Sequence, residues 1–418
     1  MARMRALRVP ALAGLLIVVA GCAHVPAHLE LPALDMRDPS FIATASAYAG
    51  TPAVPGNRLE VLLNGDQIFP AKIRAIASAK KTINFAQYVF EEGQPAIDTV
   101  RALAERCQAG VTVNVLLDAV GAFGMPAEYR EIMDKAGCHV EMFRPLSSFA
   151  LDRLNYRNHR RILVVDGRIG FTGGSGTSGK WAGNGRVEGH WRDTDVRVEG
   201  PVVEQLQGAF VENWLEATGI ALGGEDYFPH PLERKGDVEA QAVRSSPAGG
   251  STAMYTMFLL AIAAARTSIH ITNPYFVPDD KMIETLVAAA RRGVRVVLIM
   301  PGAIDHNVVR QASRGELGRL LKAGVEVYEY LPSLLHAKTM VIDGRWATVG
   351  STNLDRRSLG LNDELNLVAY DSAFARRLEE VFESDLAQSK RVTYSDWQRR
   401  GILSRVLELL AVPIRDQL

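Results

Sequence analysis

The second half of the chain carries a group of residues suited to chemistry on phosphate. His336 and Lys338 precede Asp343, and a turn containing Ser351 and Asn353 follows. The residues between the lysine and the aspartate have the pattern of a buried strand, so the imidazole and the ammonium group share one face of it. A histidine and an ammonium group aimed at one point, beside a turn with hydroxyl, amide and free backbone N–H groups, predict a phosphate site.

The first half contains a matching group. His159 and Arg161 precede Asp166 at the same spacing, and the two histidines lie 336 − 159 = 177 residues apart. Other pairs of similar segments have comparable offsets: residues 79–85 with 265–271 (265 − 79 = 186), 110–113 with 293–296 (293 − 110 = 183), and 135–137 with 322–324 (322 − 135 = 187). A nearly constant offset predicts a duplicated domain that carries one histidine motif in each copy.

Helical and extended patterns alternate along both copies. We predict a strand at residues 82–90, a helix at 96–107, a strand at 111–117 and a helix at 202–215. This alternation indicates an α/β fold. The predicted division is a tether at 22–57, an N-terminal lobe at 58–232, a C-terminal lobe at 237–390 and an amphipathic C-terminal tail at 391–418.

The N-terminus has the order of charges and apolar residues found in secretory signals. Arginines precede an apolar run at residues 9–20, which is short for a membrane span. The run ends in VAGC at residues 19–22, which resembles the lipoprotein box. It implies a signal peptide at 1–21 and lipidation of Cys22, and Ala23 resembles the outer-membrane-sorted class. We therefore expect a periplasmic lipoprotein on the outer rather than the inner membrane, with an uncleaved N-terminal anchor as the alternative.

Composition limits the partners and the metal chemistry. Lys+Arg and Asp+Glu both total 47, so no overall basic field favours a nucleic-acid partner. Outside the two motifs, histidines such as His190 and His270 lack partners at metal-ligand spacing. In an oxidising compartment Cys107 and Cys138 could pair, but two buried thiols are at least as well supported by the pattern.

The paired motifs resemble the HxK(x)4D motifs of the phospholipase D superfamily, with bacterial cardiolipin synthases as the most similar group. The likeness covers about residues 59–400 and extends to TNPYFVP at 272–278, WRDT at 191–194 and NLDRRS at 353–358. It implies two α-β-α sandwich lobes related by a pseudo-two-fold axis, with the active site between them. It also implies an enzyme that uses no metal and no cofactor.

The resemblance further implies roles for the site residues. His159 would be the nucleophile that forms a phosphohistidine and His336 the acid and base, although the residues alone permit the reverse. Lys338 and Arg161 would neutralise the phosphate oxygens, and Asp166 and Asp343 would brace the site. The remaining assignments concern orientation: Glu364 would hold a ring nitrogen of His336, and Asp193 would have the same duty in the first lobe.

The expected activity is phosphatidyl transfer on membrane phospholipids such as phosphatidylglycerol. The alternatives are a phospholipase D hydrolase, a secreted phosphodiesterase or nuclease, and a catalytically silent lipid-binding protein of the envelope. Two departures from the family pattern favour the last: Arg161 stands in place of a lysine and Gly176 in place of an asparagine. The oligomeric state is left open.

Overall fold

The computed structural model describes residues 29–145, 155–302 and 307–401 of the 418-residue chain. An N-terminal helix, α1 (Pro39–Ala49), precedes two lobes. The elements of the first lobe are β1 (Val54–Leu63), α2 (Asn64–Ser78), β2 (Thr82–Gln87), α3 (Gln94–Gln108), β3 (Thr112–Asp118), α4 (Ala127–Lys135), β4 (His139–Phe143), β5 (Ile162–Val165), β6 (Ile169–Gly173), η2 (Gly179–Trp181), β7 (Trp191–Arg192), β8 (Thr194–Glu199) and α5 (Val203–Thr218).

The second lobe repeats this order. Its elements are β9 (Val238–Ser245), η3 (Pro247–Gly249), α6 (Ala253–Ala264), β10 (Ser268–Thr272), β11 (Phe276–Val277), α7 (Asp280–Arg291), β12 (Arg295–Pro301), α8 (Asn307–Lys322), β13 (Glu326–Tyr330), β14 (Leu334–Leu335), β15 (Thr339–Ile342), β16 (Trp346–Gly350), β17 (Leu354–Asp355), α9 (Arg356–Gly360), β18 (Glu364–Tyr370), α10 (Ser372–Leu386), β19 (Ser389–Val392) and α11 (Tyr394–Gln398).

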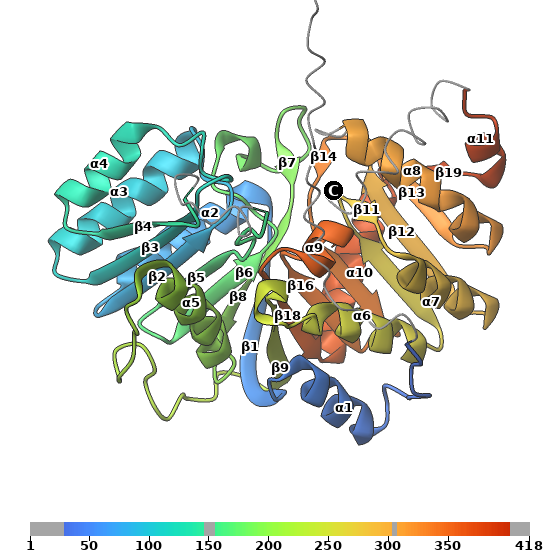
Figure 1. Ribbon diagram of the computed structural model, residues 1–418, viewed down its shortest axis with the longest axis horizontal. Helices are drawn as coiled ribbons and strands as arrows, with labels where there is room; N and C mark the ends of the chain where they lie inside the picture. The colour runs from blue at the N-terminus through green and yellow to red at the C-terminus, as the bar shows by residue number, and fades with distance from the viewer. Residues whose placement is uncertain (1–28, 146–154, 303–306, 402–418) are drawn as a thin grey trace, which may run out of the picture.

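One 15-stranded sheet runs through both lobes, in the order β19-β13-β12-β10-β15-β16-β18-β9-β1-β8-β6-β5-β2-β3-β4. The antiparallel pair β9 and β1 lies at the junction of the two lobes. Apart from β19, the strands on one side of this pair follow the same order as their counterparts in the other lobe on the other side, which is what a pseudo-two-fold axis between two copies produces. Figure 1 shows the two halves on either side of this central pair. The predicted α/β class and duplicated lobes are confirmed.

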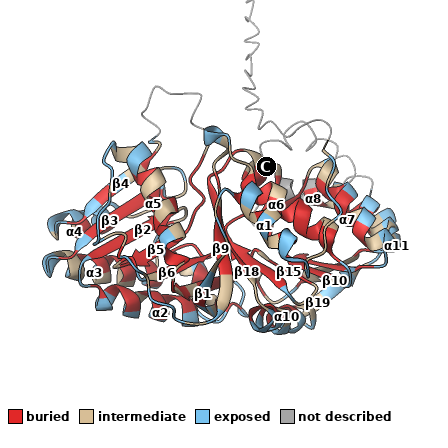
Figure 2. Ribbon diagram, turned by 90° about the horizontal axis from the view of Figure 1, so that it is seen from below, coloured by how far each residue is buried: buried red, intermediate tan, exposed pale blue. Residues whose placement is uncertain are grey.

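Helices cover both faces of the sheet, and most residues of the central strands are buried (Figure 2). Helices α2, α3 and α4 pack on one face in the first lobe, and α6, α7 and α8 do so in the second. Helices α5 and α10 share a core on the opposite face. Every residue of β2 is buried, as expected for a strand covered on both sides.

The tether predicted at residues 22–57 is wrong for its described part. Helix α1 begins after Asp38, whose side chain accepts a hydrogen bond from the Ser40 backbone N–H, and it packs on α6 of the second lobe. Phe41 and Ala45 are fully buried there. Its small and polar residues give little helical periodicity, so the sequence pattern misses it.

The C-terminal tail also differs from its prediction. Residues 389–392 add strand β19 to the edge of the sheet beside β13, and the short helix α11 follows. Trp397 packs against α8 and its indole donates to the carbonyl of Arg314 at 2.7 Å. The rest of the predicted amphipathic helix lies outside the described residues, as do the predicted signal peptide and Cys22.

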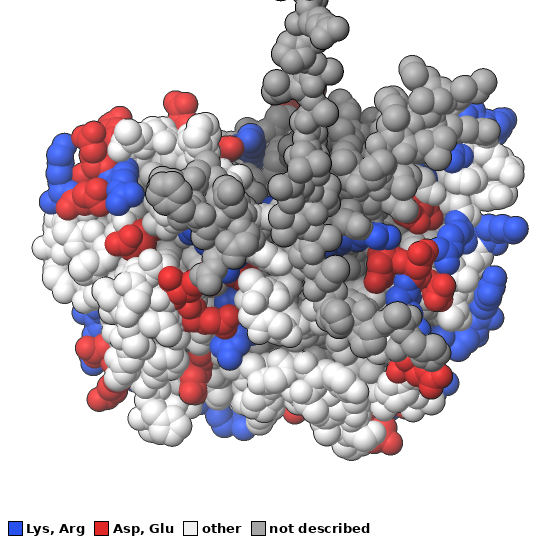
Figure 3. All heavy atoms as spheres, in the orientation of Figure 1, with Lys and Arg blue, Asp and Glu red and all other residues white. Residues whose placement is uncertain are grey.

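Cys107 of α3 and Cys138, just before β4, form a disulfide with their Cα atoms 5.5 Å apart. The sequence pattern had supported two free thiols at least as strongly. Within the described ranges no helix has the length and apolarity needed to cross a bilayer. Figure 3 shows acidic and basic side chains interspersed over the described atoms of one face.

Candidate active site

Both motif histidines lie in the interior, each just before the middle strand of its lobe's half of the sheet. His159 precedes β5 and His336 precedes β15, which are equivalent positions in the two lobes. The two residues are 7% and 4% exposed. Burial is the main cause that lowers the pKa of both histidines; Lys338 of the second lobe lowers that of His159 further, and Arg161 of the first lobe lowers that of His336 further. The two motifs therefore form one electrostatic site.

The two lobes exchange backbone hydrogen bonds at this site. The N–H of His159 donates to the carbonyl of Asp363 at 2.9 Å, and the N–H of His336 donates to the carbonyl of Arg192 at 2.7 Å. Strands β14 and β7 pair in parallel beside the second of these bonds. Each contact places the backbone at a histidine against a residue of the other lobe that directly precedes a carboxylate: Asp363 precedes Glu364, and Arg192 precedes Asp193.

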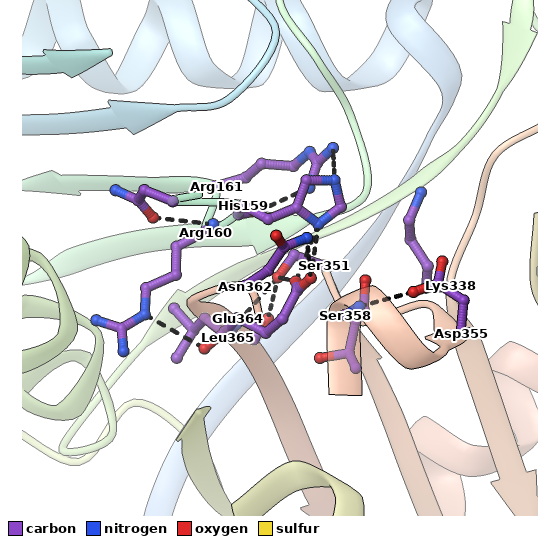
Figure 4. A network of polar contacts seen from close by, with 12 residues as sticks. His159, Arg160, Arg161, Lys338, Ser351, Asp355, Ser358, Asn362, Glu364 and Leu365 are labelled. Atoms are coloured by element: carbon purple, nitrogen blue, oxygen red, sulfur yellow. Dashed lines mark hydrogen bonds and ion pairs between the residues drawn. The ribbon is translucent and has the colours of Figure 1, made fainter. Parts of the chain in front are cut away.

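As a result, each histidine is held by the carboxylate of the opposite lobe. Nδ1 of His159 lies 2.9 and 3.0 Å from the two carboxylate oxygens of Glu364, as Figure 4 shows. Nδ1 of His336 lies 2.7 Å from Oδ2 of Asp193. The expected pairing of Glu364 with His336, and of Asp193 with the histidine of its own lobe, is wrong. The repeat identifies the two carboxylates but not the crossing of the two lobes.

A cation lies at the other ring nitrogen of each histidine. Nη2 of Arg161 is 3.1 Å from Nε2 of His159. Nζ of Lys338 is 2.9 Å from Nε2 of His336 and equally far from its Nδ1, which also faces Asp193. The guanidinium group only donates, so Nε2 of His159 accepts, and the ionised Asp193 only accepts, so Nδ1 of His336 carries the hydrogen and its Nε2 accepts. Both imidazoles therefore present an Nε2 lone pair beside a positive charge.

The electrostatic settings of the two carboxylates differ. Burial raises the pKa of Glu364 to about 7, despite the opposing hydrogen bond from Ser351. Burial also opposes ionisation of Asp193, but His336, Lys338 and the indole of Trp181 outweigh it and bring the pKa of Asp193 well below its usual range. Asp193 is thus a full anion at neutral pH, whereas Glu364 titrates near neutrality.

The basic groups of the site are shifted toward their neutral forms. Burial and the charge of Lys338 lower the pKa of His336 to about 3, although Asp193 acts in the opposite direction. Burial, with the charge of Arg161, lowers the pKa of His159 well below its ordinary value. Burial lowers the pKa of Lys338 to about 7, against the effect of Asp193. Both imidazoles are therefore neutral in the free site.

The two motif aspartates lie away from the histidines, at the far ends of β5 and β15. The Asp166 carboxylate accepts from the backbone N–H groups of Lys80, Lys81 and Thr82, which lead into β2. Asp343 accepts equivalent bonds at the start of β10, including one from Thr267. Their grouping with the catalytic residues is therefore wrong: they fix the ends of neighbouring strands and touch no reacting group.

The turn after β16 supports the second half of the site. The hydroxyl of Ser351 donates to Glu364 and accepts from the N–H of Leu365 at 3.0 Å. Asn353 is 5% exposed, and its Oδ1 has no partner among the described residues. In the first lobe the equivalent turn has Gly176, and the indole of Trp181 donates to Asp193 at 2.8 Å.

Aromatic rings surround the histidines. The ring centroid of Tyr88 is 4.9 Å from that of His159, and those of Trp191 and Tyr275 are 5.1 and 6.2 Å from that of His336. Trp181, whose ring centroid is 5.3 Å from that of His336, was missed. Its only sequence signal is a tryptophan shortly after the glycine-rich turn.

Paired histidines, each with a carboxylate and a cation, define a two-lobe site of the phospholipase D type. The family model described as "Cardiolipin synthase, PLD-like domain" matches residues 73–214 and 258–386. Cardiolipin synthase 1 of Bacillus anthracis is 33% identical over 388 residues, which are 91% of this chain and 76% of that protein. The major cardiolipin synthase of Bacillus subtilis is 34% identical over 359 residues, covering 84% and 73%.

The chain therefore belongs to the phospholipase D superfamily, as a cardiolipin synthase-like phosphatidyltransferase with two PLD-like domains. The resemblance inferred from its motifs is confirmed. A solved structure supports the fold: phosphatidylserine synthase of Haemophilus influenzae superposes with a TM-score of 0.64 at 13% identity, covering 90% of this chain and all of that one.

Proposed function

We propose that this protein transfers a phosphatidyl group between two phosphatidylglycerol molecules and so makes cardiolipin and glycerol. The observation that carries the proposal is the pair of neutral imidazoles, each with Nε2 beside a cation and Nδ1 held by a carboxylate of the opposite lobe. Relatives of similar sequence named cardiolipin synthases support the choice of substrate.

The first step breaks the bond between phosphorus and the glycerol headgroup. Nε2 of His159 attacks phosphorus, a phosphorus–nitrogen bond forms, and His336 gives its proton to the departing glycerol oxygen. Arg161 and Lys338 offset the charge that builds on the non-bridging oxygens. In the second step the headgroup hydroxyl of another phosphatidylglycerol gives its proton to His336 and attacks the same phosphorus, which frees His159.

The acid needs a proton on His336 that the empty site does not favour, since its pKa there is about 3. A bound phosphodiester brings a negative charge next to the ring and offsets Lys338, which raises that pKa. The ionised Asp193 stabilises the imidazolium further. Glu364 beside His159 is only partly ionised near neutrality, so this asymmetry favours His336 as the acid and His159 as the nucleophile.

The proposed location is the periplasm, with the lipid on Cys22 anchoring the enzyme to a membrane, the outer rather than the inner. The disulfide between Cys107 and Cys138 supports an oxidising compartment. Radiolabelled palmitate should appear in the full chain and be absent from a Cys22→Ala variant. Label retained in that variant would overturn the anchor.

The function is tested by mass spectrometry of products formed from phosphatidylglycerol vesicles in the presence of a chelator. Wild-type protein and the variants His159→Ala and His336→Ala, all lacking residues 1–22, are compared. Cardiolipin and glycerol that disappear in both variants support the proposal. Phosphatidic acid in place of cardiolipin would make the protein a hydrolase, and absence of product would reject phosphatidyl transfer from this lipid.

A further inference from the structure

The first lobe differs from the second in what surrounds its carboxylate. In the second lobe the hydroxyl of Ser351 donates to Glu364. The equivalent first-lobe residue is Gly174, and a side chain there would collide with Asp193, because an added Cβ would lie 2.2 Å from Oδ1. The first lobe therefore needs another donor for its carboxylate, from a different part of the chain.

That donor is the indole of Trp181. Its Nε1 lies 2.8 Å from Oδ2 of Asp193, the same oxygen that lies 2.7 Å from Nδ1 of His336. The other oxygen, Oδ1, accepts from the backbone N–H of Thr194 at 2.8 Å. Asp193 is fully buried, so these donors replace the water that would otherwise solvate the carboxylate.

Gly176 provides the space that the indole occupies. An added Cβ at this position would lie 2.6 Å from Cη2 and Cζ3 of Trp181 and 3.0 Å from Cβ of Val89. An asparagine, such as the second lobe carries in Asn353, cannot stand at residue 176 while Trp181 keeps its place. The departure from the family pattern at Gly176 thus has a structural reason.

The backbone around Trp181 is fixed by close contacts. The N–H of Thr177 donates to the carbonyl of Val89 at 2.9 Å, and the N–H of Gly179 donates to that of Glu92 at 3.0 Å. Gly65 lies so close that an added Cβ would be 1.9 Å from the carbonyl oxygen of Trp181. The indole is therefore held in place by its backbone as well as by the packing of its ring.

We propose that Trp181 is a positioning residue of this active site: its indole N–H fixes the Asp193 carboxylate, and that carboxylate orients His336. The absence of a side chain at Gly176 leaves the space that the indole needs. The indole N–H of Trp181 acts through Asp193, and its ring also packs edge-on against that of His336. The kinetic part of this inference rests on the proposed phosphatidyl transfer, whereas the orientation of His336 is measurable without turnover.

The test compares Trp181→Phe, which keeps an aromatic ring but loses the N–H, with Trp214→Phe. Trp214 is also buried, lies on α5 with its ring stacked on Phe210, and its indole N–H has no hydrogen-bond partner among the described residues. Trp181→Phe should lower kcat for cardiolipin formation about 10- to 100-fold, the loss typical of a hydrogen bond to a charged group, with KM changed less than about twofold. Trp214→Phe should keep the wild-type kcat.

Two further readouts separate positioning from general loss of structure. In nitrogen-15 NMR the ring N–H of His336 should shift in Trp181→Phe and stay in place in Trp214→Phe. Gly176→Ala should lower kcat about 10-fold or more alone but less than about threefold in the Trp181→Phe background, because the shorter ring leaves room for the added Cβ.

An unchanged kcat and His336 resonance in Trp181→Phe would overturn the proposal, as would equal effects in Trp214→Phe. Full additivity of the Gly176 and Trp181 substitutions would reject the role given to Gly176. If wild-type protein makes no cardiolipin, the proposed function fails, while the His336 resonance still decides the positioning role.

Discussion

The two halves of the active site have the same backbone arrangement but different residues around their carboxylates. In the second lobe Glu364 is held by Ser351, and burial raises its pKa to about 7. In the first lobe the shorter Asp193 is held by Trp181 and remains ionised. The duplicated fold thus places a carboxylate, a cation and a histidine in both lobes, while burial and the neighbouring groups, chiefly His336 and Lys338 at Asp193, set the charge of each carboxylate.

The difference extends one layer further from the histidines. Within the first-lobe turn, Ser175 donates to Asp195 at 2.7 Å, and Lys72 of α2 forms an ion pair with the same carboxylate at 2.7 Å. In the second lobe Thr352 donates at 2.7 Å to the uncharged Asn366. A small cavity of about 10 Å³ lies there, lined by residues that include Phe258, Lys338, Thr352 and Asn366.

Arg161 and Gly176, the two departures from the family motif, therefore belong to a first lobe that is rebuilt over several positions. The guanidinium group of Arg161 retains a donor at Nε2 of His159 and also donates to the backbone carbonyl of His159 at 2.8 Å. Gly176 admits Trp181. These replacements preserve the hydrogen-bonding of the site, which argues against the silent lipid-binding alternative.

The largest expected effect follows removal of either carboxylate. Asp193→Asn and Glu364→Gln should each lower kcat about 10³- to 10⁴-fold, because an amide can donate where the imidazole needs an acceptor and so favours the wrong tautomer. Initial rates of cardiolipin formation measure this, with the exposed Glu60→Gln as the control. A variant that keeps a tenth of wild-type activity would break the cross-lobe account for that histidine.

The next effect concerns the buried ion pair between Lys72 and Asp195, where the described second lobe has the uncharged Asn366 in place of the aspartate. Lys72→Met leaves Asp195 charged and unpaired in the interior, so the free energy of unfolding should fall by about 3–5 kcal/mol. Adding Asp195→Asn, which copies the second lobe, should restore most of the loss. Urea denaturation measures both, and Lys135→Met on the surface is the control. A double variant no more stable than Lys72→Met would contradict this comparison.

The disulfide also distinguishes the lobes, because the second lobe contains no cysteine. It spans 31 residues, and replacing Cys107 and Cys138 by serine should lower the free energy of unfolding by about 2–4 kcal/mol. Hydrogen exchange should increase mainly in α3, α4 and the strands beside them. Equal increases in α7 and α8 would show that the bond stabilises the whole molecule instead.

The smallest effect is a shift in pH dependence. Glu364 becomes protonated as the pH falls through about 7, and Lys338 loses its proton as the pH rises through about 7, so activity should peak near neutrality. In Lys338→Arg the cation remains charged, and the alkaline limb of the kcat profile should move to higher pH. A limb that stays in place would show that another group controls it.

The sequence predicts the duplicated fold and the main catalytic residues because the repeated segments are visible in the sequence itself. The constant offset between the lobes and the strand pattern after each histidine are local features, and they lead to the duplicated fold and to His159, His336, Arg161 and Lys338. Helix α1 was missed because its periodicity is weak, and its burial depends on α6, which is far away in the chain.

The sequence could not predict which carboxylate pairs with which histidine, for a different reason. Glu364 and Asp193 were both identified, but which histidine each holds depends on the backbone bonds that cross between lobes at residues 159 and 336. The repeat is consistent with either arrangement. Trp181 was missed because its role depends on the space left by Gly176, which only packing reveals.

The most direct test of the central claim is to trap the covalent intermediate. His336→Ala and His159→Ala are each incubated with phosphatidyl-p-nitrophenol, whose leaving group departs without help from an acid, quenched in mild base to preserve phosphorus–nitrogen bonds, and mapped by peptide mass spectrometry. The account predicts a phosphatidyl adduct on the peptide containing His159 in His336→Ala, and none in His159→Ala. An adduct on His336 in the His159→Ala protein, with none on His159, would reverse the assigned roles and contradict the account.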